Sequence, residues 1–279
     1  MNTKKFLCSL LCVSMIISGL GITAYAEDDN RLAEIAIDSA LISRGVPQTI
    51  LNEMPIEVKS IIYEDESLYF KGASGVLYDQ EAHSFEDYTI SNDGIMPLGQ
   101  IPTADLTLNF SFWGSFTSSS TIKVFFHYDW KNLPAFRWQD PMAVSWNDEL
   151  FEMPPQTFYK VDKFDGYKLD PSSVDVYYPV TGEIHSEENG YADASPAGVT
   201  WYADLKGYGS GIKIKKLYGY GYFSLEKITS ASGSSILYGH YVHPTVSTTP
   251  YINIGDYGTF SVSGGSNYDE RGSSVRIDY

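Results

Sequence analysis

Apolar residues alternate with polar residues along much of this chain, most regularly between residues 121 and 146. In the segment TIKVFFHYDWKNLPAFRWQDPMAVSW, apolar side chains recur at every second position from residue 122 to 130 and again from 142 to 146. A period of two is that of a β-strand with one buried face. Three of the five tryptophans lie in this segment, so we expect it to supply the centre of a β-sheet core.

Similar short runs lie on both sides of this segment. They are ADLTLNFSFWG before it and, after it, QTFYKVDKF, SVDVYYPV, GVTWYADL, GIKIKKLYGYGYFSLEKI, SILYGHYVH, PYINIGDYGTFSVSG and SVRIDY. Pairs of turn-forming residues separate them, at Asp165-Gly166, Asp170-Pro171, Thr181-Gly182, Asn189-Gly190 and Gly264-Gly265. Short strands without a long helix after residue 65 predict a mainly β protein. We expect an antiparallel β-sandwich, jelly-roll-like or barrel-like, over residues 102–279.

A short helical segment precedes the strands, over residues 27–66. Its first part, RLAEIAIDSALISRG, has apolar positions three and four apart and ends at Gly45, a residue suited to a helix C-cap. Two short helices are expected after it, each with a proline in its first turn, at Pro47 and Pro55. The segment is interpreted either as a lid on the sandwich or as a separate partner-binding piece. Residues 67–101, rich in glycine, acids and turn residues, are expected to form a linker or a hairpin.

The first 26 residues have the pattern of a signal peptide. Lys4 and Lys5 precede an apolar run over residues 6–22, and Ala24-Tyr25-Ala26 matches the small-x-small cleavage rule. We therefore expect a secreted, extracellular protein after cleavage near Ala26. Both cysteines, Cys8 and Cys12, lie in this peptide, so the secreted form has neither disulfides nor thiol chemistry.

The charge of the chain limits its partners. Its 35 acidic and 19 basic residues give a net charge of −16. Such a charge argues against nucleic acid as a partner and against simple electrostatic attraction to anionic lipid or wall polymers. No motif indicates a cofactor, and no pattern indicates an oligomeric state.

The sequence indicates no catalytic residue and no metal site. His240 and His243 form an HxxH pair without the glutamate of the zinc-protease motif, and on a strand they would face opposite sides. No serine lies in the Gly-x-Ser-x-Gly pattern of α/β-hydrolases. A polysaccharide hydrolase needs only two carboxylates at a suitable separation. The acids to test for that hypothesis are those near the 121–146 segment: Asp129, Asp140, Asp148 and Glu149.

Aromatic residues offer the more informative pattern. Three tyrosines alternate with Gly219 and Gly221, which places a row of rings on one face of a strand and bare backbone on the other. Exposed rings stack on sugars or settle at membrane interfaces, and buried rings fill a wide core while glycine lets another strand approach. All of these interpretations stay open. The candidate contact residues are Trp113, Trp138, Trp201, Tyr218, Tyr220 and Tyr222.

Several segments resemble a group of secreted proteins of Gram-positive bacteria, some of which are likened to geobacillin-type large bacteriocins. These segments are GVPQTILNEMPIEVKSIIYE, GQIPTADLTL, NLPAFRWQDPMAVSW, GVTWYADLKG, YGYGYFSLE, YGHYVHP and INIGDYGTFSVSGGSNYDERG. The resemblance implies a class of protein and no catalytic motif.

Three functional hypotheses follow from the residues and the resemblance. The first is a secreted, non-catalytic binding module that acts extracellularly or at the cell surface on a surface or polysaccharide ligand. The second is a large, heat-labile antibacterial protein, the one case in which a membrane would be a partner. The third is a polysaccharide hydrolase.

Overall fold

The computed structural model describes residues 23–73, 76–79, 84–87, 101, 105–115, 120–170, 172, 177–188, 191–205, 207, 211–245, 250–255, 259–264 and 267–279, with only the backbone of residues 23–30, 76–79, 84–87 and 115. The predicted signal peptide lies outside this part of the chain except for residues 23–26. Among the described residues, no helix is long and apolar enough to cross a membrane.

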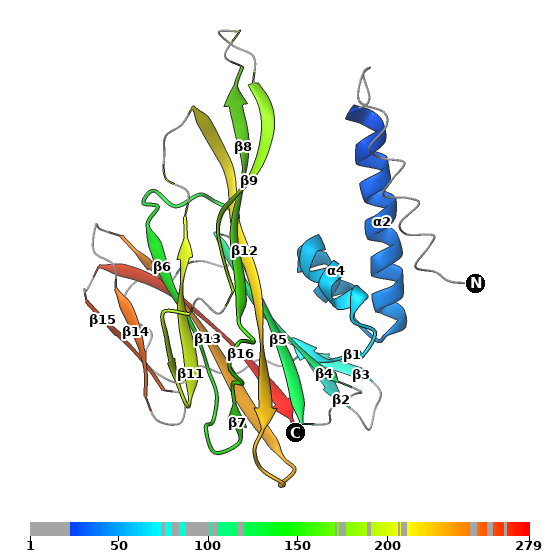
Figure 1. Ribbon diagram of the computed structural model, residues 1–279, viewed down its shortest axis with the longest axis vertical. Coiled ribbons are helices and arrows are strands. Elements are labelled where there is room, and N and C mark those ends of the chain that lie inside the picture. The colour runs from blue at the N-terminus through cyan, green and yellow to red at the C-terminus, as the bar shows by residue number, and fades with distance from the viewer. Residues whose placement is uncertain are drawn as a thin grey trace.

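Two antiparallel sheets face each other and form a sandwich (Figure 1). Sheet A has the order β3 (Ser84–Asp87), β2 (Val76–Asp79), β1 (Leu68–Ala73), β4 (Leu106–Ser115), β5 (Thr121–Trp130), β12 (Ile212–Lys227), β8 (Tyr159–Leu169) and β9 (Tyr177–Glu188), and β7 (Phe151–Glu152) also pairs with β12. Sheet B has the order β10 (Asp193–Ser195), β11 (Gly198–Asp204), β6 (Gln139–Ser145), β13 (Ser234–Pro244) and β16 (Tyr268–Asp278). A separate pair, β14 (Tyr251–Ile254) and β15 (Phe260–Ser263), packs on the outer face of sheet B. The predicted mainly β fold with antiparallel sheets and short N-terminal helices is confirmed.

The main core lies between the two sheets and is rich in aromatic residues. On β5, every second residue from Ile122 to Trp130 points into it, as the alternation predicts. Trp201 of sheet B lies against Phe126 of sheet A, with ring centroids 4.4 Å apart. Because both sheets supply large buried rings, the sandwich holds its layers together by apolar burial.

Three helices cover part of the outer face of sheet A (Figure 1). They are α2 (Thr23–Ser43), α3 (Gln48–Glu53) and α4 (Ile56–Glu64). Pro47 and Pro55 occupy the N-cap positions of α3 and α4, and Gly45 after α2 has a φ of +87°, so the end of α2 and the starts of α3 and α4 follow the sequence pattern, whereas α2 begins at Thr23, before the expected residue 27. The buried Lys59 of α4 holds α2 through two ion pairs of 2.9 Å, to Glu34 and Asp38.

The helices and sheet A enclose a second apolar core. Leu41, Leu51 and Ile62 of the helices pack with Trp113 and Phe125 of the sheet. The described residues of the 67–101 segment contribute β1, β2 and β3, which extend sheet A beyond β4.

Two predicted turns are wrong. Asp165-Gly166 lies within β8 and Thr181-Gly182 lies within β9. Both glycines serve close packing inside strands. A Cβ on Gly166 would lie 2.6 Å from the Lys213 carbonyl oxygen, and one on Gly182 would lie 2.6 Å from the Phe164 ring. The uninterrupted strands β8 and β9, with the start of β12, form an arm that projects beyond the rest of the sandwich (Figure 1).

Candidate binding surface

Two of the predicted contact tryptophans lie in the cores. Trp113 is completely buried beneath the helices, where its ring meets Phe70 edge-on at 5.3 Å. Trp201 is 1% exposed between the sheets. A buried ring cannot stack on an external ligand, so the contact role expected for these two residues is corrected to core packing.

Trp138 is the predicted tryptophan that reaches the surface. Its side chain is 50% exposed, and the nearby Phe136 is 47% exposed, both in the connection between β5 and β6. The backbone of this connection is held at both ends. Lys131 N–H donates to the Asp105 carbonyl at 2.7 Å, and Leu205 N–H donates to the Trp138 carbonyl at 3.0 Å.

The row of tyrosines on β12 lies on the outer face of sheet A. Tyr220 pairs with His127 of β5, and residues directly opposite in an antiparallel pair share a face. Tyr218 and Tyr220 are buried, at 9% and 8% exposure, and Tyr222 is partly buried. Tyr220 and Tyr222 pack in the core beneath the helices, so the helices cover this part of the row.

Beyond Tyr218, the same face continues onto the projecting arm and becomes exposed. The Asp165 carboxylate of β8 accepts a hydrogen bond from Tyr218 Oη at 3.4 Å, so Asp165 lies on the face of the tyrosine row. Tyr167, two residues further along β8, lies on the same face, and it pairs with Lys213 of β12. Tyr177 of β9 lies on the same face, because it pairs with Leu169, two residues from Tyr167. We call this part, made of Tyr167, Tyr177 and Lys213, the arm surface.

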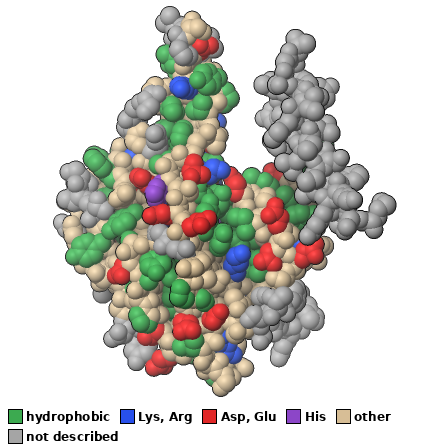
Figure 2. Space-filling view, viewed as in Figure 1, with side chains coloured by type: hydrophobic (Ala, Val, Ile, Leu, Met, Phe, Trp, Pro, Cys, Tyr) green, Lys and Arg blue, Asp and Glu red, His purple; other side chains and the backbone are tan. Residues whose placement is uncertain are grey.

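The arm surface contains an open depression of about 270 Å³, and its three residues line it among the residues that the structure describes. Tyr167 is 36% exposed and Tyr177 is 52% exposed. In space-filling view, the projecting end shows hydrophobic and basic side chains, with acidic atoms near its tip (Figure 2). The three residues lie on the adjacent hydrogen-bonded strands β8, β9 and β12, so the backbone positions them before any ligand binds.

Cations lie over the rings along this outer face. Lys216 Nζ is 4.7 Å from the centroid of the Tyr218 ring, and Lys123 Nζ is 4.7 Å from that of Tyr222. Burial, together with nearby acids, raises the pKa of Tyr218 and Tyr220 well above the usual tyrosine range. These hydroxyls therefore stay protonated and can donate hydrogen bonds.

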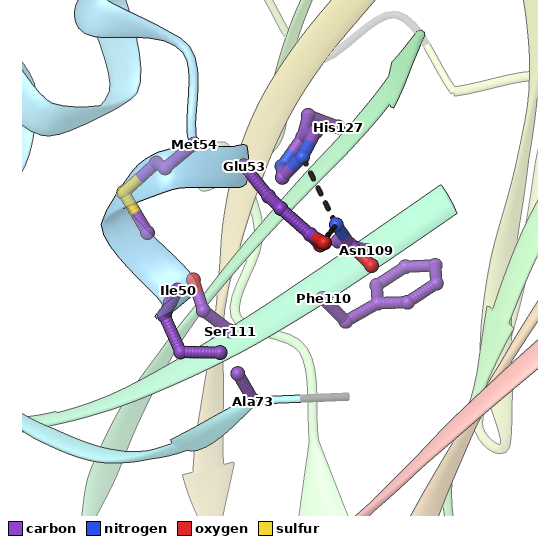
Figure 3. Close-up of a pocket in the computed structure, with 8 residues that line it drawn as sticks. All are labelled: Ile50, Glu53, Met54, Ala73, Asn109, Phe110, Ser111 and His127. Carbon is purple, nitrogen blue, oxygen red and sulfur yellow. Dashed lines mark hydrogen bonds between the residues drawn. The ribbon is translucent and has the colours of Figure 1, made fainter. Parts of the chain in front are cut away.

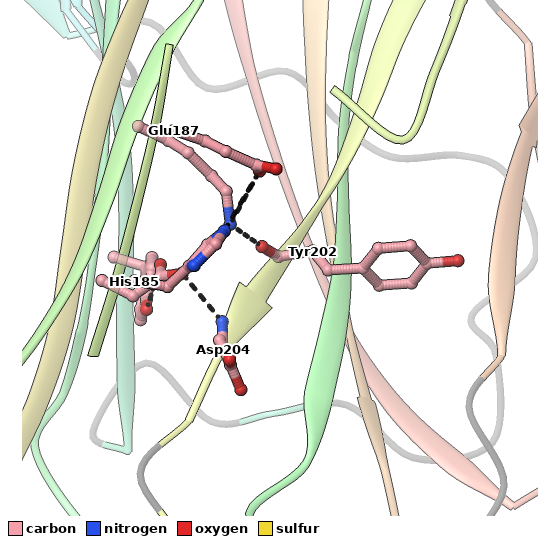
Figure 4. Close-up of polar contacts among 7 residues, drawn as sticks. His185, Glu187, Tyr202 and Asp204 are labelled. Atoms are coloured by element: carbon pink, nitrogen blue, oxygen red, sulfur yellow. Dashed lines mark hydrogen bonds and ion pairs between the residues drawn. The ribbon is translucent and has the colours of Figure 1, made fainter. Parts of the chain in front are cut away.

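A buried polar cluster joins the two sheets at the β8–β11 side (Figure 4). The Asp162 carboxylate accepts hydrogen bonds from Tyr128 Oη at 2.8 Å, from Lys160 Nζ at 3.1 Å and from Asp204 N–H at 2.9 Å. Lys160 Nζ also donates to the Tyr202 carbonyl. The backbone groups of Tyr202 and Asp204 lie beyond the β10 pairing, which ends at Thr200. The side chains of Lys160 and Asp162 thus supply hydrogen-bond partners for backbone groups at the edge of β11 that β10 leaves unpaired, which is a structural role.

A second buried network contains one of the acids considered for hydrolysis. Asp140 is completely buried, and its Oδ2 accepts a hydrogen bond from Tyr241 Oη at 2.6 Å and lies 2.8 Å from His243 Nδ1. Trp130 Nε1 donates to Tyr241 Oη at 3.0 Å. Burial raises the pKa of Asp140. A carboxylate so enclosed does not reach a polysaccharide.

The structure does not bring the four candidate acids together. Asp129 lies on the outer face of sheet A, with Lys216 Nζ at 3.2 Å, whereas Asp140 points into the sandwich. Asp148 and Glu149 follow the far end of β6, a strand of seven residues that begins beside Asp140. From Asp140 to Ser145 the strand rises roughly 17 Å, too far for Asp140 to form a catalytic carboxylate pair with either acid.

A small cavity lies between α3 and the outer face of sheet A, next to His127 (Figure 3). Asn109 Nδ2 donates to Glu53 Oε2 at 2.6 Å and lies 3.4 Å from His127 Nε2. Burial lowers the pKa of His127 to about 4, so its imidazole is neutral at neutral pH. The cavity volume of about 20 Å³ has room for about one water molecule.

The histidines of the HxxH pair separate onto opposite faces of sheet B. His240 Nε2 lies 2.8 Å from Glu270 Oε2 on the outer face, and His243 contacts Asp140 inside. In the described part of the chain, no three His, Cys, Asp or Glu side chains are grouped to hold a metal ion.

No protein-family model matches this chain, and no curated protein matches it. One matching solved structure is that of AvmM, which catalyses macrocyclization in alchivemycin A biosynthesis. It is 10% identical, and the match covers 66% of this chain and 95% of that one, with a TM-score of 0.26. A likeness at that score carries no inference about function.

Sequence reasoning missed the arm surface. Tyr177 and Lys213 lay in predicted strands, but Tyr167 did not, because the strand predicted over QTFYKVDKF ended at Phe164, before the predicted Asp165-Gly166 turn. The alternation of Lys213 with Ile212 and Ile214 was the available signal for an exposed strand face. Nothing in that signal identified β8 and β9 as the neighbouring strands.

Proposed function

We propose that this protein is a secreted, non-catalytic β-sandwich protein that binds an extracellular or cell-surface polysaccharide. The observation that carries the proposal is the exposure of Tyr167 and Tyr177 beside Lys213, around one open depression on a hydrogen-bonded arm. Flat, amphipathic rings contact sugar rings through their faces, and the phenol and ammonium groups donate hydrogen bonds to sugar hydroxyls.

Preorganisation supports the same proposal. Strand backbones position the rings, so binding orders few additional groups. The separation of the four candidate acids favours binding over hydrolysis. Trp138 and Phe136, on a tethered connection, offer additional exposed rings.

The test is retention of the secreted form on a panel of insoluble bacterial-wall and plant polysaccharides. Tyr167→Ala and Tyr177→Ala should each weaken retention by about 1 kcal/mol, roughly fivefold, through loss of ring contact. Tyr251→Ala removes a similarly exposed ring, 49% exposed, from the β14–β15 pair and should leave retention unchanged. Lack of retention on every polymer, or an equal loss in Tyr251→Ala, would contradict the proposal.

A further inference from the structure

Four lysines of β8 and β12 on the outer face of sheet A differ in whether they are paired with an acid. Lys163 forms an ion pair with Glu57 of α4, and Lys216 Nζ lies 3.2 Å from Asp129 Oδ2. Lys213 and Lys215, both exposed on the arm, have no carboxylate within ion-pair distance among the described residues. Lys163 and Lys216 are thus paired with carboxylates of the protein, whereas Lys213 and Lys215 on the arm are available to a ligand.

One of the available lysines lines the depression, and the other lies beside one of its rings. Lys213 lines it with Tyr167 and Tyr177. The pairing of β12 with β8 shifts between Ile214 and Lys216, which inserts Lys215 as an extra residue. Lys215 Nζ lies 5.9 Å from the centroid of the Tyr167 ring. The β-bulge thus brings a second ammonium group to the ring that Lys213 faces.

Asp165, the nearest acid on the same face of β8, accepts hydrogen bonds from neighbouring hydroxyl groups. Asp165, two residues from Tyr167 on β8, accepts a hydrogen bond from Thr181 Oγ1 at 2.8 Å and one from Tyr218 Oη at 3.4 Å. Asp165 is not among the described residues that line the depression, whose charged side chains are Lys213 and, beside the Tyr167 ring, Lys215, on a chain with a net charge of −16. An anionic polymer would be repelled by most of the molecule and attracted at the arm, which orients the encounter.

We propose that the ligand is an anionic polysaccharide, whose carboxylate or phosphate groups bind Lys213 and Lys215 while its sugar rings contact Tyr167 and Tyr177. This inference rests on the proposed polysaccharide-binding function and adds the class of ligand. It also refines the expectation from net charge. The net negative charge of the chain repels anionic wall polymers, but the lysines at the arm surface attract them locally.

The experiment uses two matched pairs of polymers. Polygalacturonate is compared with its methyl-esterified, neutral form, and a phosphate-bearing wall polysaccharide is compared with the same polymer after removal of its phosphate. The charged member of at least one pair should bind about tenfold more tightly, and its binding should weaken as salt is raised. Which pair shows the preference identifies carboxylate or phosphate as the anion.

Variants locate the effect. The double variant Lys213→Gln/Lys215→Gln should lose roughly tenfold in affinity for the charged polymer and little for the neutral one. Lys213→Arg/Lys215→Arg should keep the preference. Lys227→Gln removes the same charge at the opposite end of β12 and should behave as wild type. Thermal midpoints equal to that of the wild type show that the variants are folded.

The outcomes separate the two proposals. Lack of retention on every polymer overturns the polysaccharide-binding function itself. Binding that depends on Tyr167 but is equal for charged and neutral polymers, or is unchanged by Lys213→Gln/Lys215→Gln, preserves that function and overturns the anionic ligand.

Discussion

At the scale of single residues, the alternation of tyrosine and glycine on β12 has a packing explanation. The glycines face the interior, and aromatic rings of the adjacent strand lie across them. A Cβ on Gly219 would lie 2.3 Å from the Tyr128 ring, and one on Gly221 would lie 2.4 Å from the Phe126 ring. The tyrosines consequently face outward, toward the helices and the arm.

Replacing Gly219 with alanine should therefore destabilise the protein. The added methyl group displaces the Tyr128 ring, whose hydroxyl donates to Asp162, and overpacking of this kind costs about 1–3 kcal/mol. Gly207→Ala is the matched control, because a Cβ there meets no atom within 4 Å, and its effect should stay within about 0.5 kcal/mol. Urea unfolding measures both. Equal stability of the two variants would refute the packing explanation.

At the scale of elements, the uncovered edge of β11 explains why an ion pair lies inside an apolar sandwich. An unpaired strand edge leaves backbone N–H and C=O groups that need partners when they are buried. Lys160 and Asp162 of β8 reach across from sheet A and bond to the Tyr202 carbonyl and the Asp204 N–H of sheet B. Two side chains thus replace a missing strand and tie the sheets together.

Lys160→Met should test this tie. It leaves the Asp162 carboxylate buried without its cation and the Tyr202 carbonyl without its donor, a loss that costs about 3–5 kcal/mol. Lys168→Met on the same strand removes an exposed lysine of the arm and should cost at most about 0.5 kcal/mol. The free energies of unfolding of the two variants are compared by urea titration. A small, equal change in both would show that the tie contributes little.

At the scale of the whole molecule, the helices divide the outer face of sheet A into a covered part and an open arm. Under the covered part, His127 is buried between α3 and the sheet. Its pKa is about 4 in the folded protein, below the ordinary value of 6.5. Between these two pH values the unfolded chain binds more protons than the folded one, so this group makes stability fall as pH falls.

The size of this pH effect can be measured. Between pH 7 and pH 5, His127 should remove about 2 kcal/mol of stability from the wild type, and His127→Gln should lack that loss. Asp140 and Asp162 act in the opposite direction, because burial raises the pKa of both carboxyls, and the variant leaves them in place. His185→Gln, at an exposed histidine, is the control. Equal pH dependence in the wild type and His127→Gln would contradict this account.

The sequence by itself determined the local structure and the two sides of most strands. Gly45, Pro47 and Pro55 set the end of α2 and the starts of α3 and α4 because they act through the backbone of their own segment. A period of two places alternate residues on opposite faces whatever lies next to the strand, so the inward residues of β5 were predictable.

Only the tertiary structure decided which face is covered and which strands are neighbours. Trp113 and Trp138 both have aromatic residues close to them in the sequence. The helices nevertheless bury Trp113, whereas Trp138 is exposed to solvent. Tyr167, Tyr177 and Lys213 come together because β8 lies between β9 and β12, a strand order set by packing over long sequence separations. Side-chain periodicity contains no information about that order, because it describes each strand alone.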